Sequence, residues 1–447
     1  MARKPDHLIY GIDDTPPFPV LFLLGVQHIF LMSSSLVLPV VLVSEIGGSF
    51  DQVRSVVALT MISCGIGTIL QAIRFGGVGS GYLCPNLCGP NFFTASMTAA
   101  WLGGMPLMRG MTIVAGLVEI IFAGALSRLK FLFPPEITGL VVLMVAVGLI
   151  PLAVSKSLGI NYEGEPIQGA CVAVAFLTLL LMIGINIWGK GKLKLYSVLA
   201  GMITGYLLSL ATGLLTGAHV QIIAEVPWLA LPSTDEMLNI SFRWSLLPTF
   251  VIVSITGALK SFGNLIMCEK VNDAEWTKPD TRRIGNGLMA DALCVTVSGL
   301  LGGMASDTSA SNVAFSNASG ATSRIIGYMA GGLFIIIGFL PKITGALSIM
   351  PMPVMGAILI FVTCFMIISG IQIILGAGMD NQKTFVIGVS LIFGLSLDLL
   401  PTLYVGVPHL IRPLFESSLT LCTVMAVVLN QLLRLRRTSE TIVASGR

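Results

Sequence analysis

Two apolar segments of the chain carry an ionisable side chain near their middle. Lys260 lies in the run TGALKSFGNLIMCEK, and Asp291 lies in the run GNGLMADALCVTVSGLLGGM. A third stretch, residues 306–323, consists almost entirely of Ser, Thr, Asn, Gly and Ala. A charge at the centre of a bilayer costs about 2.5–3.5 kcal/mol on insertion scales, so such side chains face an internal site and are functional candidates. We therefore expect residues 256–324 to hold the functional site.

The composition places these residues in a membrane. Of the 447 residues, 55% are hydrophobic and 11% are charged, and the mean hydropathy is +0.91. Soluble domains have about 25% charged residues. The net charge is +3 and there is no long basic run, so the sequence gives no indication of nucleic-acid binding. The eight cysteines mostly lie singly in apolar segments, a pattern typical of packing, so we expect no disulfide framework, no metal site and no cofactor.

The apolar segments predict an all-α polytopic membrane protein with fourteen transmembrane spans. About 20 mainly apolar residues cross the ~30 Å hydrocarbon layer. The predicted spans are 18–44, 54–73, 80–101, 109–128, 138–155, 168–188, 195–216, 247–268, 284–302, 306–323, 325–345, 352–376, 384–400 and 415–434. We predict that spans 3 and 10 are discontinuous, because Pro85, Gly89 and Pro90 interrupt the third and the tenth is very polar. Such spans are tolerated only where the backbone lines a cavity or is buried in protein.

The positions of Lys and Arg predict the orientation. An even number of spans puts both termini on one side, and that side then carries about three times as many Lys and Arg residues as the other, which identifies it as the cytoplasm. We expect an integral protein of the plasma (inner) membrane, with cytoplasmic N- and C-termini.

The two polar or interrupted spans occupy matching places. A first repeat of residues 1–217, an extracellular connection of residues 218–246 and a second repeat of residues 247–447 give seven spans on each side, and the interrupted span is third in each half. An odd number of spans per half predicts an inverted repeat. Paired interrupted spans are the best sequence pointer to a secondary transporter's substrate site, where helix N-termini would face the substrate's oxygens.

Several motifs resemble one family. They are YGIDDTPPFPVLFLLGVQHIFLM in the first span, VGSGYL before the third, GLMADALCVTVSGLLGG in the ninth and ATSR closing the tenth. They resemble the nucleobase–ascorbate, or xanthine/uracil, permease family over nearly the whole chain. The resemblance implies a core domain (18–128 and 247–345) that holds the substrate, a gate domain (138–216 and 352–434) and a homodimer.

Two departures from the family pattern concern the site. Of the tenth-span signature only Asn312 and Gly320 remain, and Lys260 stands in the eighth span where the family carries a Glu. The family carboxylates bind the ring N–H groups of a neutral nucleobase and take part in proton coupling. With a cation in place of this carboxylate, we expect a preference for anionic substrates.

The candidate residues fall into two sets. The candidates for substrate binding are Lys260, Ser261, Asn264, Asn91, Phe92, Ser311, Asn312, Ala314 and Phe315. The candidates for coupling or for ordering the site are Gln27, His28, Glu119 and Asp291. Structural roles are the alternative: Lys260 could pair with Asp291 or Glu119, His28 could form a packed pair with Gln27, and the phenylalanines could be core residues.

The function that we predict is secondary active transport of a nucleobase such as xanthine, uracil or urate, by proton-coupled uptake through an elevator motion. The alternative is an anion transporter or exchanger of the sulfate-permease type on the same fold. An enzyme is not expected, because the four histidines do not lie beside Ser or Asp in the spacing of a nucleophile and its base. Of these, His7 and His409 lie outside the residues described below, as does the side chain of His219. The expected partners are a small-molecule substrate, membrane lipids and a second copy of the chain.

Overall fold

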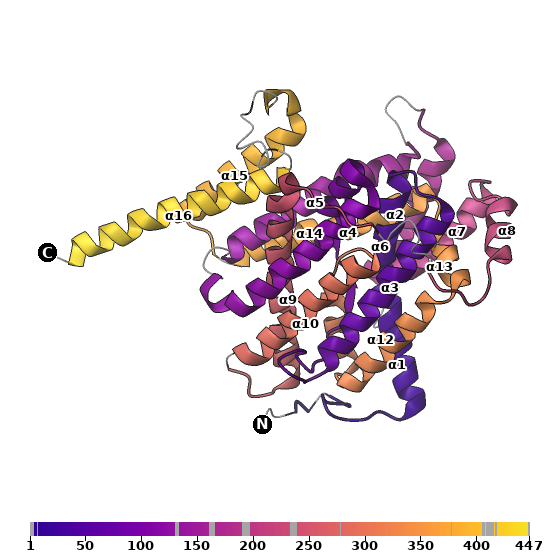
Figure 1. Ribbon diagram of the computed structural model, residues 1–447, viewed down its shortest axis with the longest axis horizontal. Coiled ribbons are helices and arrows are strands. Elements are labelled where there is room, and N and C mark those ends of the chain that lie inside the picture. Colours follow the sequence, from indigo (N-terminus) through magenta and orange to yellow (C-terminus); the bar gives the residue numbers. More distant parts are fainter. Residues whose placement is uncertain are drawn as a thin grey trace.

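The computed structural model is almost entirely helical (Figure 1). It describes residues 4–6, 8–129, 134–160, 166–189, 197–232, 239–277, 279–376, 378–404, 407, 415 and 418–445. Parts of the predicted connection 218–246 and of the span 195–216 therefore lie outside the described residues.

The elements follow the predicted spans. The first part of the chain contains α1 (Phe18–Ser33), η1 (Ser34–Leu36), α2 (Val37–Glu45), α3 (Phe50–Ala72), β1 (Asn86–Cys88), α4 (Pro90–Leu129), α5 (Pro135–Leu158), α6 (Gly169–Trp188), α7 (Ser197–Ala211) and α8 (Gly217–Glu225). The second part contains η3 (Trp244–Leu246), α9 (Leu247–Asn272), α10 (Thr281–Leu301), β2 (Ser306–Thr308), α11 (Ala310–Ser319), α12 (Arg324–Gly338), α13 (Pro341–Ser348), α14 (Met352–Gly376), α15 (Asn381–Leu399), η4 (Pro401–Tyr404) and α16 (Ser418–Ser445). Helix α8, in the connection, and the two short strands were not anticipated.

Among the described residues, nine helices are long and apolar enough to cross a membrane. A tenth is added if α12 and α13, which are bent by 77°, form one span. The protein is therefore a polytopic membrane protein, and the number fourteen stays a prediction. Helix α4 contains the boundary between the predicted third and fourth spans, because Gly103 and Gly104 are non-helical and Gly104 has a φ of +66°. A left-handed φ of this kind favours glycine.

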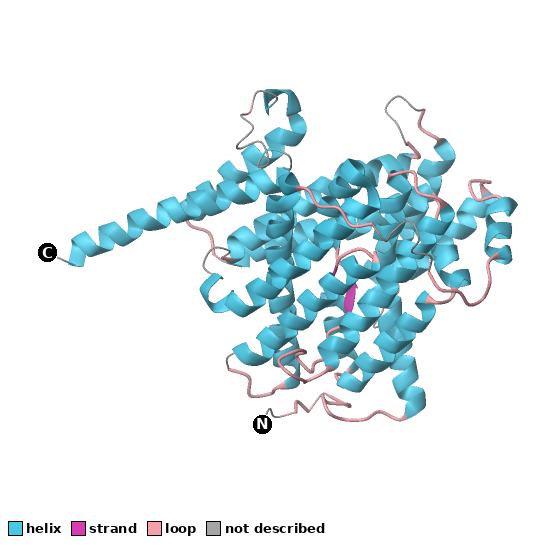
Figure 2. Cartoon of the chain, in the orientation of Figure 1, coloured by secondary structure: helices cyan, strands magenta, loops and turns pink. Residues whose placement is uncertain are grey.

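The two short strands lie deep among the helices (Figure 2). Strands β1 and β2 pair antiparallel, with Asn86 opposite Thr308, and all six of their residues are buried. Each strand ends just before a helix, α4 or α11. The pairing satisfies backbone N–H and C=O groups that would otherwise be costly at this depth. Two distant parts of the chain thereby meet in the interior.

The helices pack in two groups. In the first helix group α10 packs on α4, α12 on α3, and α4 and α10 on α9. In the second helix group α14 packs on α5, and α6 contacts both α7 and α14. Close backbone approach occurs in each: a Cβ on Gly331 would lie 2.6 Å from the carbonyl oxygen of Gly65, and one on Gly139 would lie 2.7 Å from that of Gly370. Small residues permit such approach between membrane helices.

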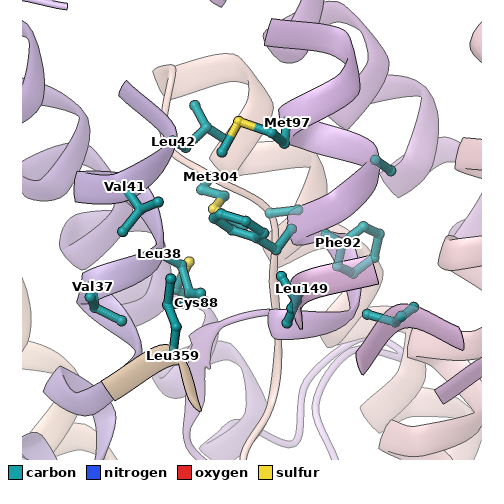
Figure 3. Close-up of a cluster of buried hydrophobic side chains, with 14 of the residues drawn as sticks. Val37, Leu38, Val41, Leu42, Cys88, Phe92, Met97, Leu149, Met304 and Leu359 are labelled. Atoms are coloured by element: carbon teal, nitrogen blue, oxygen red, sulfur yellow. The ribbon is translucent and has the colours of Figure 1, made fainter. Parts of the chain in front are cut away.

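A cluster of buried apolar side chains lies where the two groups meet (Figure 3). It includes Val41 from α2, Met97 from α4, Leu149 from α5 and Leu359 from α14, all 4% exposed or less. Close packing of this kind, repeated over many atom pairs, holds apolar helices together. The groups are thus in tight contact at the level of Leu149 and Leu359.

The N-terminal segment crosses the turn between α11 and α12. The amides of Ile9 and Tyr10 donate to the carbonyl oxygen of Gly320 at 2.8 and 3.0 Å. Asp13 pairs with Arg324 at 3.0 Å. Nearby, a hydrogen bond from Lys4 holds the pKa of the Asp14 carboxyl below its usual value. The segment therefore ties down the start of α12.

Candidate functional site

A cavity of about 950 Å³ lies between the two helix groups. The first helix group lines it with polar side chains: Asn91 of α4, Lys260 and Asn264 of α9, and Ser311 of α11. The second helix group lines it mostly with apolar side chains, among them Val142, Phe361, Phe365, Met366 and Ile373. The second helix group also contributes the polar side chains Thr138, Asn186, Ser197 and Ser369. A small number of polar groups in a mostly apolar cavity is typical of small-molecule sites of 300–1,000 Å³.

The charge at the cavity wall belongs to an ion pair. The Nζ of Lys260 lies 2.9 Å from the Oδ2 of Asp307 in β2, and the Nδ2 of Asn91 donates to the same oxygen at 3.0 Å. The side chain of Lys260 is 28% exposed, whereas that of Asp307 is 1% exposed. The structural alternative for Lys260 was a pair with Asp291 or Glu119, and the structure pairs it with Asp307 instead. The strand pairing brings Asp307, not Asp291 or Glu119, to α9.

Asp291 lies behind the wall and joins three elements. Its Oδ1 accepts from the Nδ2 of Asn86 in β1 at 2.7 Å, and its Oδ2 accepts from the Oγ of Ser261 in α9 at 2.5 Å. Ser261 in turn accepts from the Oγ1 of Thr308 at 2.8 Å. Both oxygens of this buried carboxylate are therefore satisfied, as burial requires.

The amides of Asn91 and Asn264 have fixed orientations. The Nδ2 of Asn264 donates to the backbone oxygen and the Oγ1 of Thr308 at 3.1 and 2.9 Å, and the Nδ2 of Asn91 donates to Asp307. Because only the NH₂ end of an amide can donate, the two carbonyl oxygens point elsewhere. No hydrogen bond from the described residues reaches either of them. Both residues line the cavity, so each offers an acceptor there.

His28 and Asn312 order the start of α11. The Nδ1 of His28 lies 2.6 Å from the Oδ1 of Asn312, whose Nδ2 donates to the Oγ of Ser309 at 2.8 Å. The amide direction therefore makes His28 Nδ1 the donor. Ser309 also caps α11 by accepting from the backbone amide of Asn312, and its own Oγ lies 3.0 Å from that of Ser311. With its acceptor positions used, Ser309 donates to Ser311 and leaves the Ser311 proton for the cavity.

Of the remaining sequence candidates, Ala314 lines the cavity and the others do not. Among the others, Phe92, Phe315, Asn312 and Ser261 are at most 1% exposed. The ring of Phe315 packs edge-on against His28, with centroids 5.1 Å apart. Glu119 is buried, and neither carboxylate oxygen has a partner among the described residues. Gln27 does not line the cavity either.

Sequence reasoning left out several residues of the site. Asp307 was not among its binding candidates, although it is the charged residue in the polar run 306–323 and a natural partner for an intramembrane Lys. The wall is supported by Asn86 from β1, Thr308 from β2 and Ser309 from the turn before α11. No group of His, Cys, Asp and Glu suited to a metal ion occurs in the part of the chain that the structure describes.

Apolar helices around a cavity with one polar wall define an integral membrane transport protein. A sequence model of the permease family, the xanthine/uracil permeases, matches residues 20–403. The chain belongs to this family. Its relatives are permeases, which fits the expectation of a transporter rather than an enzyme.

Three relatives cover most of the chain. A candidate purine permease of Clostridium perfringens is 27% identical over 440 residues, covering 97% of this chain and 94% of its own. The nucleobase transporter PlUacP of Paenibacillus larvae is 26% identical, covering 81% and 83%. The xanthine permease XanP of Escherichia coli is 24% identical, covering 95% and 94%. All three carry a nucleobase or a purine in their names.

Solved structures with the same fold include a bicarbonate transporter and an anion transporter. The transmembrane domain of the cyanobacterial bicarbonate transporter BicA superposes with a TM-score of 0.54 at 13% identity, covering 92% of this chain and 96% of that one. The murine anion transporter Slc26a9, in an inward-facing state, gives a TM-score of 0.61 at 10% identity, covering 96% and 70%. At these identities the likeness concerns the fold alone.

Proposed function

We propose that the protein transports a nucleobase of the xanthine, uracil or urate class across the membrane. The observation that carries the proposal is the cavity between the helix groups, with donors and acceptors on one wall and apolar side chains on the other. The relatives by sequence are named for nucleobases and purines. The anion transporters share the fold alone, so the alternative of an anion exchanger is not favoured.

The polar wall matches the edge of a lactam ring. Lys260 and Ser311 supply donors for a ring carbonyl oxygen or ring nitrogen, and the amide oxygens of Asn91 and Asn264 supply acceptors for ring N–H groups. A site built to pair N–H and C=O groups rejects analogues that lack them, because its own polar groups would stay unpaired. The apolar side chains opposite would cover the faces of the ring.

The architecture that we propose has fourteen spans in an inverted seven-plus-seven repeat, with spans 3 and 10 discontinuous. The pairing of β1 with β2 supports this arrangement, since the strands lie in corresponding spans of the two repeats and each precedes a helix. The first helix group would belong to the core domain (18–128 and 247–345), and the second to the gate domain (138–216 and 352–434). The protein would act as a homodimer in the plasma membrane.

The location of the cavity supports transport by alternating access. The cavity is lined by the start of α5 and α7 and by the later part of α14. The apolar cluster extends along α5 and α14, and it includes the later part of α5 and the earlier part of α14, which do not line the cavity. With both termini in the cytoplasm, the first of these sides faces inward. The protein is then in an inward-open state, and an elevator motion of the core group against the gate group would expose the wall outward.

Proton coupling would use a buried group of the core. Glu119 and Asp291 are the carboxyl groups that we propose for it, with His28 and Gln27 ordering the site. Substrate accumulation in proteoliposomes under an imposed pH gradient tests the coupling. Accumulation that is unaffected by the gradient would exclude proton symport.

Substrate-dependent thermal stabilisation of the purified protein tests the function. A ligand at 100 times its Kd adds about 2.7 kcal/mol to the stability of the native state. We expect a shift of the melting temperature with purines or pyrimidines and none with bicarbonate or sulfate. A shift with these simple anions alone would contradict nucleobase transport and favour the anion exchanger.

A further inference from the structure

We propose that Asp307 is a specificity-determining residue that neutralises Lys260 and thereby restricts the cavity to uncharged heterocycles. The inference rests on the proposed function and deepens it, because it names the charge state of the substrate. It replaces the expectation of an anionic substrate, which considered Lys260 without its partner. It also narrows the proposed class to xanthine and uracil, because urate is an anion at neutral pH.

The geometry of the ion pair allows Lys260, but not Asp307, to contact the substrate. Asp307 is held from two sides by Lys260 and Asn91, at 2.9 and 3.0 Å, and is almost fully buried. Lys260 is partly exposed and lines the cavity. An ammonium has three N–H donors, and its one hydrogen bond in the part of the chain that the structure describes goes to Asp307. The remaining donors are available to a carbonyl oxygen.

The net charge of the cavity wall decides whether a neutral or an anionic substrate is favoured. Lys260 is the ionisable residue among the described residues that line the cavity. Its positive charge is cancelled by a carboxylate in direct contact, so an entering anion meets a dipole instead of a free cation. An anion would lose its hydration without gaining a full counter-charge, and burial of such an uncompensated charge is costly. A neutral lactam loses less hydration than an anion does, and hydrogen bonds to the wall replace those that it made to water.

The position of Asp307 in the strand makes it a selectivity element rather than a general support. Its neighbours Ser306 and Thr308 contact Cys294 and Ser261, which lie behind the wall, and Thr308 also accepts from the wall residue Asn264. Asp307 contacts the two wall residues Lys260 and Asn91. Replacement by Asn keeps the shape and an acceptor oxygen for Lys260 while it removes the charge.

The test compares neutral and anionic ligands, and its matched pair is orotamide and orotate, which differ in a carboxamide and a carboxylate. Binding to the purified full-length protein is measured for this pair, and for hypoxanthine and urate as a purine pair that differs in its ring oxygens as well as in charge. The proteins are the wild type, Asp307→Asn, and the double variant Lys260→Met/Asp307→Asn, in which neither charge remains. The unliganded melting temperature of each variant verifies its folding.

We expect the wild type to bind the neutral member of the pair at least about tenfold more tightly, because a buried charge without a counter-charge is disfavoured. Asp307→Asn frees the charge of Lys260 and should reverse the preference toward the anion. The double variant should prefer the neutral ligand again, which separates the effect of charge from a change of shape. An unchanged ratio in Asp307→Asn, or a wild type that prefers the anion, would overturn the inference.

Failure of the proposed function is recognised separately. If the wild type binds none of the four heterocycles, nucleobase transport is contradicted. Binding of bicarbonate and sulfate is then measured to test the role of Asp307. Binding of these ions by Asp307→Asn but not by the wild type supports neutralisation of Lys260. Their binding by the wild type itself overturns it.

Discussion

Lys260 and Asp307 lie 47 positions apart and meet because a three-residue strand carries one of them to the helix of the other. The sequence was sufficient to mark Lys260 and Ser311 as candidates, because a charge or a polar helix break in an apolar segment is costly without a role. It could not assign the partner of Lys260, since Asp291, Glu119 and Asp307 all lie at a compatible depth. Only the register of β1 with β2 separates them.

Asn312 provides a test of the order at the start of α11. Asn312→Ala removes the acceptor of His28 Nδ1 and a donor to Ser309, and an unsatisfied buried group costs about 1–3 kcal/mol. We expect a lower melting temperature together with a raised KM, because Ser309 then no longer positions Ser311. Ser319→Ala, at the far end of the same helix, is the control. A stable variant with unchanged KM would show that the contact between His28 and Asn312 does not order the wall.

At the scale of elements, hydropathy located the long apolar helices, nine of which among the described residues are long and apolar enough to cross a layer that excludes charges. The helical break at Gly103 and Gly104 follows from adjacent glycines between two apolar runs. The strands were not predicted as strands, since the pairing of Asn86 with Thr308 is a tertiary event between distant segments. Local propensity decides little in a segment so short. The sequence marked these positions as interrupted but not as paired.

The contact of α3 with α12 depends on a glycine pair. A Cβ on Gly331 would lie 2.6 Å from the carbonyl oxygen of Gly65 and 2.8 Å from the side chain of Ile69. Gly331→Ala should therefore push the helices apart and cost about 1–3 kcal/mol, which is the usual penalty of overpacking. The melting temperature in detergent measures it.

The neighbouring Gly332 is the matched control. A Cβ there meets nothing within 4 Å, so Gly332→Ala adds helix propensity without a clash. We expect it to keep or raise the melting temperature. Equal effects of the two substitutions would mean that close approach of α3 and α12 does not limit stability.

At the scale of the whole molecule, two helix groups meet at an apolar contact and enclose a cavity with one polar wall. The only charged lining residue of the described chain, Lys260, comes with its polar neighbours from one group, whereas the other group lines the cavity mostly with apolar side chains. A relative motion of the groups would therefore carry Lys260 and these neighbours as a unit. The resemblance of sequence motifs implied a core domain and a gate domain, and that division stays a prediction. The resemblance could not anticipate which side is open, because that depends on the packing of α5 against α14.

A cysteine at Ser311 reports which side of the membrane reaches the wall. Cys364 is the exposed native cysteine, whereas the other seven are buried. The substitution Cys364→Ser therefore lowers the labelling of native cysteines. In this background we expect Ser311→Cys to react with an impermeant thiol reagent from the cytoplasmic side. Substrate should protect it, since Ser311 lines the cavity. Ser316→Cys, which is 2% exposed on the same helix, should stay unreactive.

Alternating access makes a further demand on the same variant. If the core group moves against the gate group, the thiol at position 311 becomes reactive from the outside as well, in a fraction of molecules that rises when substrate is supplied outside and exchange begins. The apolar cluster around Leu149 and Leu359 must then open, because it closes that side in the inward-open state. Labelling from the cytoplasmic side alone, under every substrate gradient, would identify a one-sided vestibule and contradict the elevator motion. Labelling from both sides at once would identify a continuous pore.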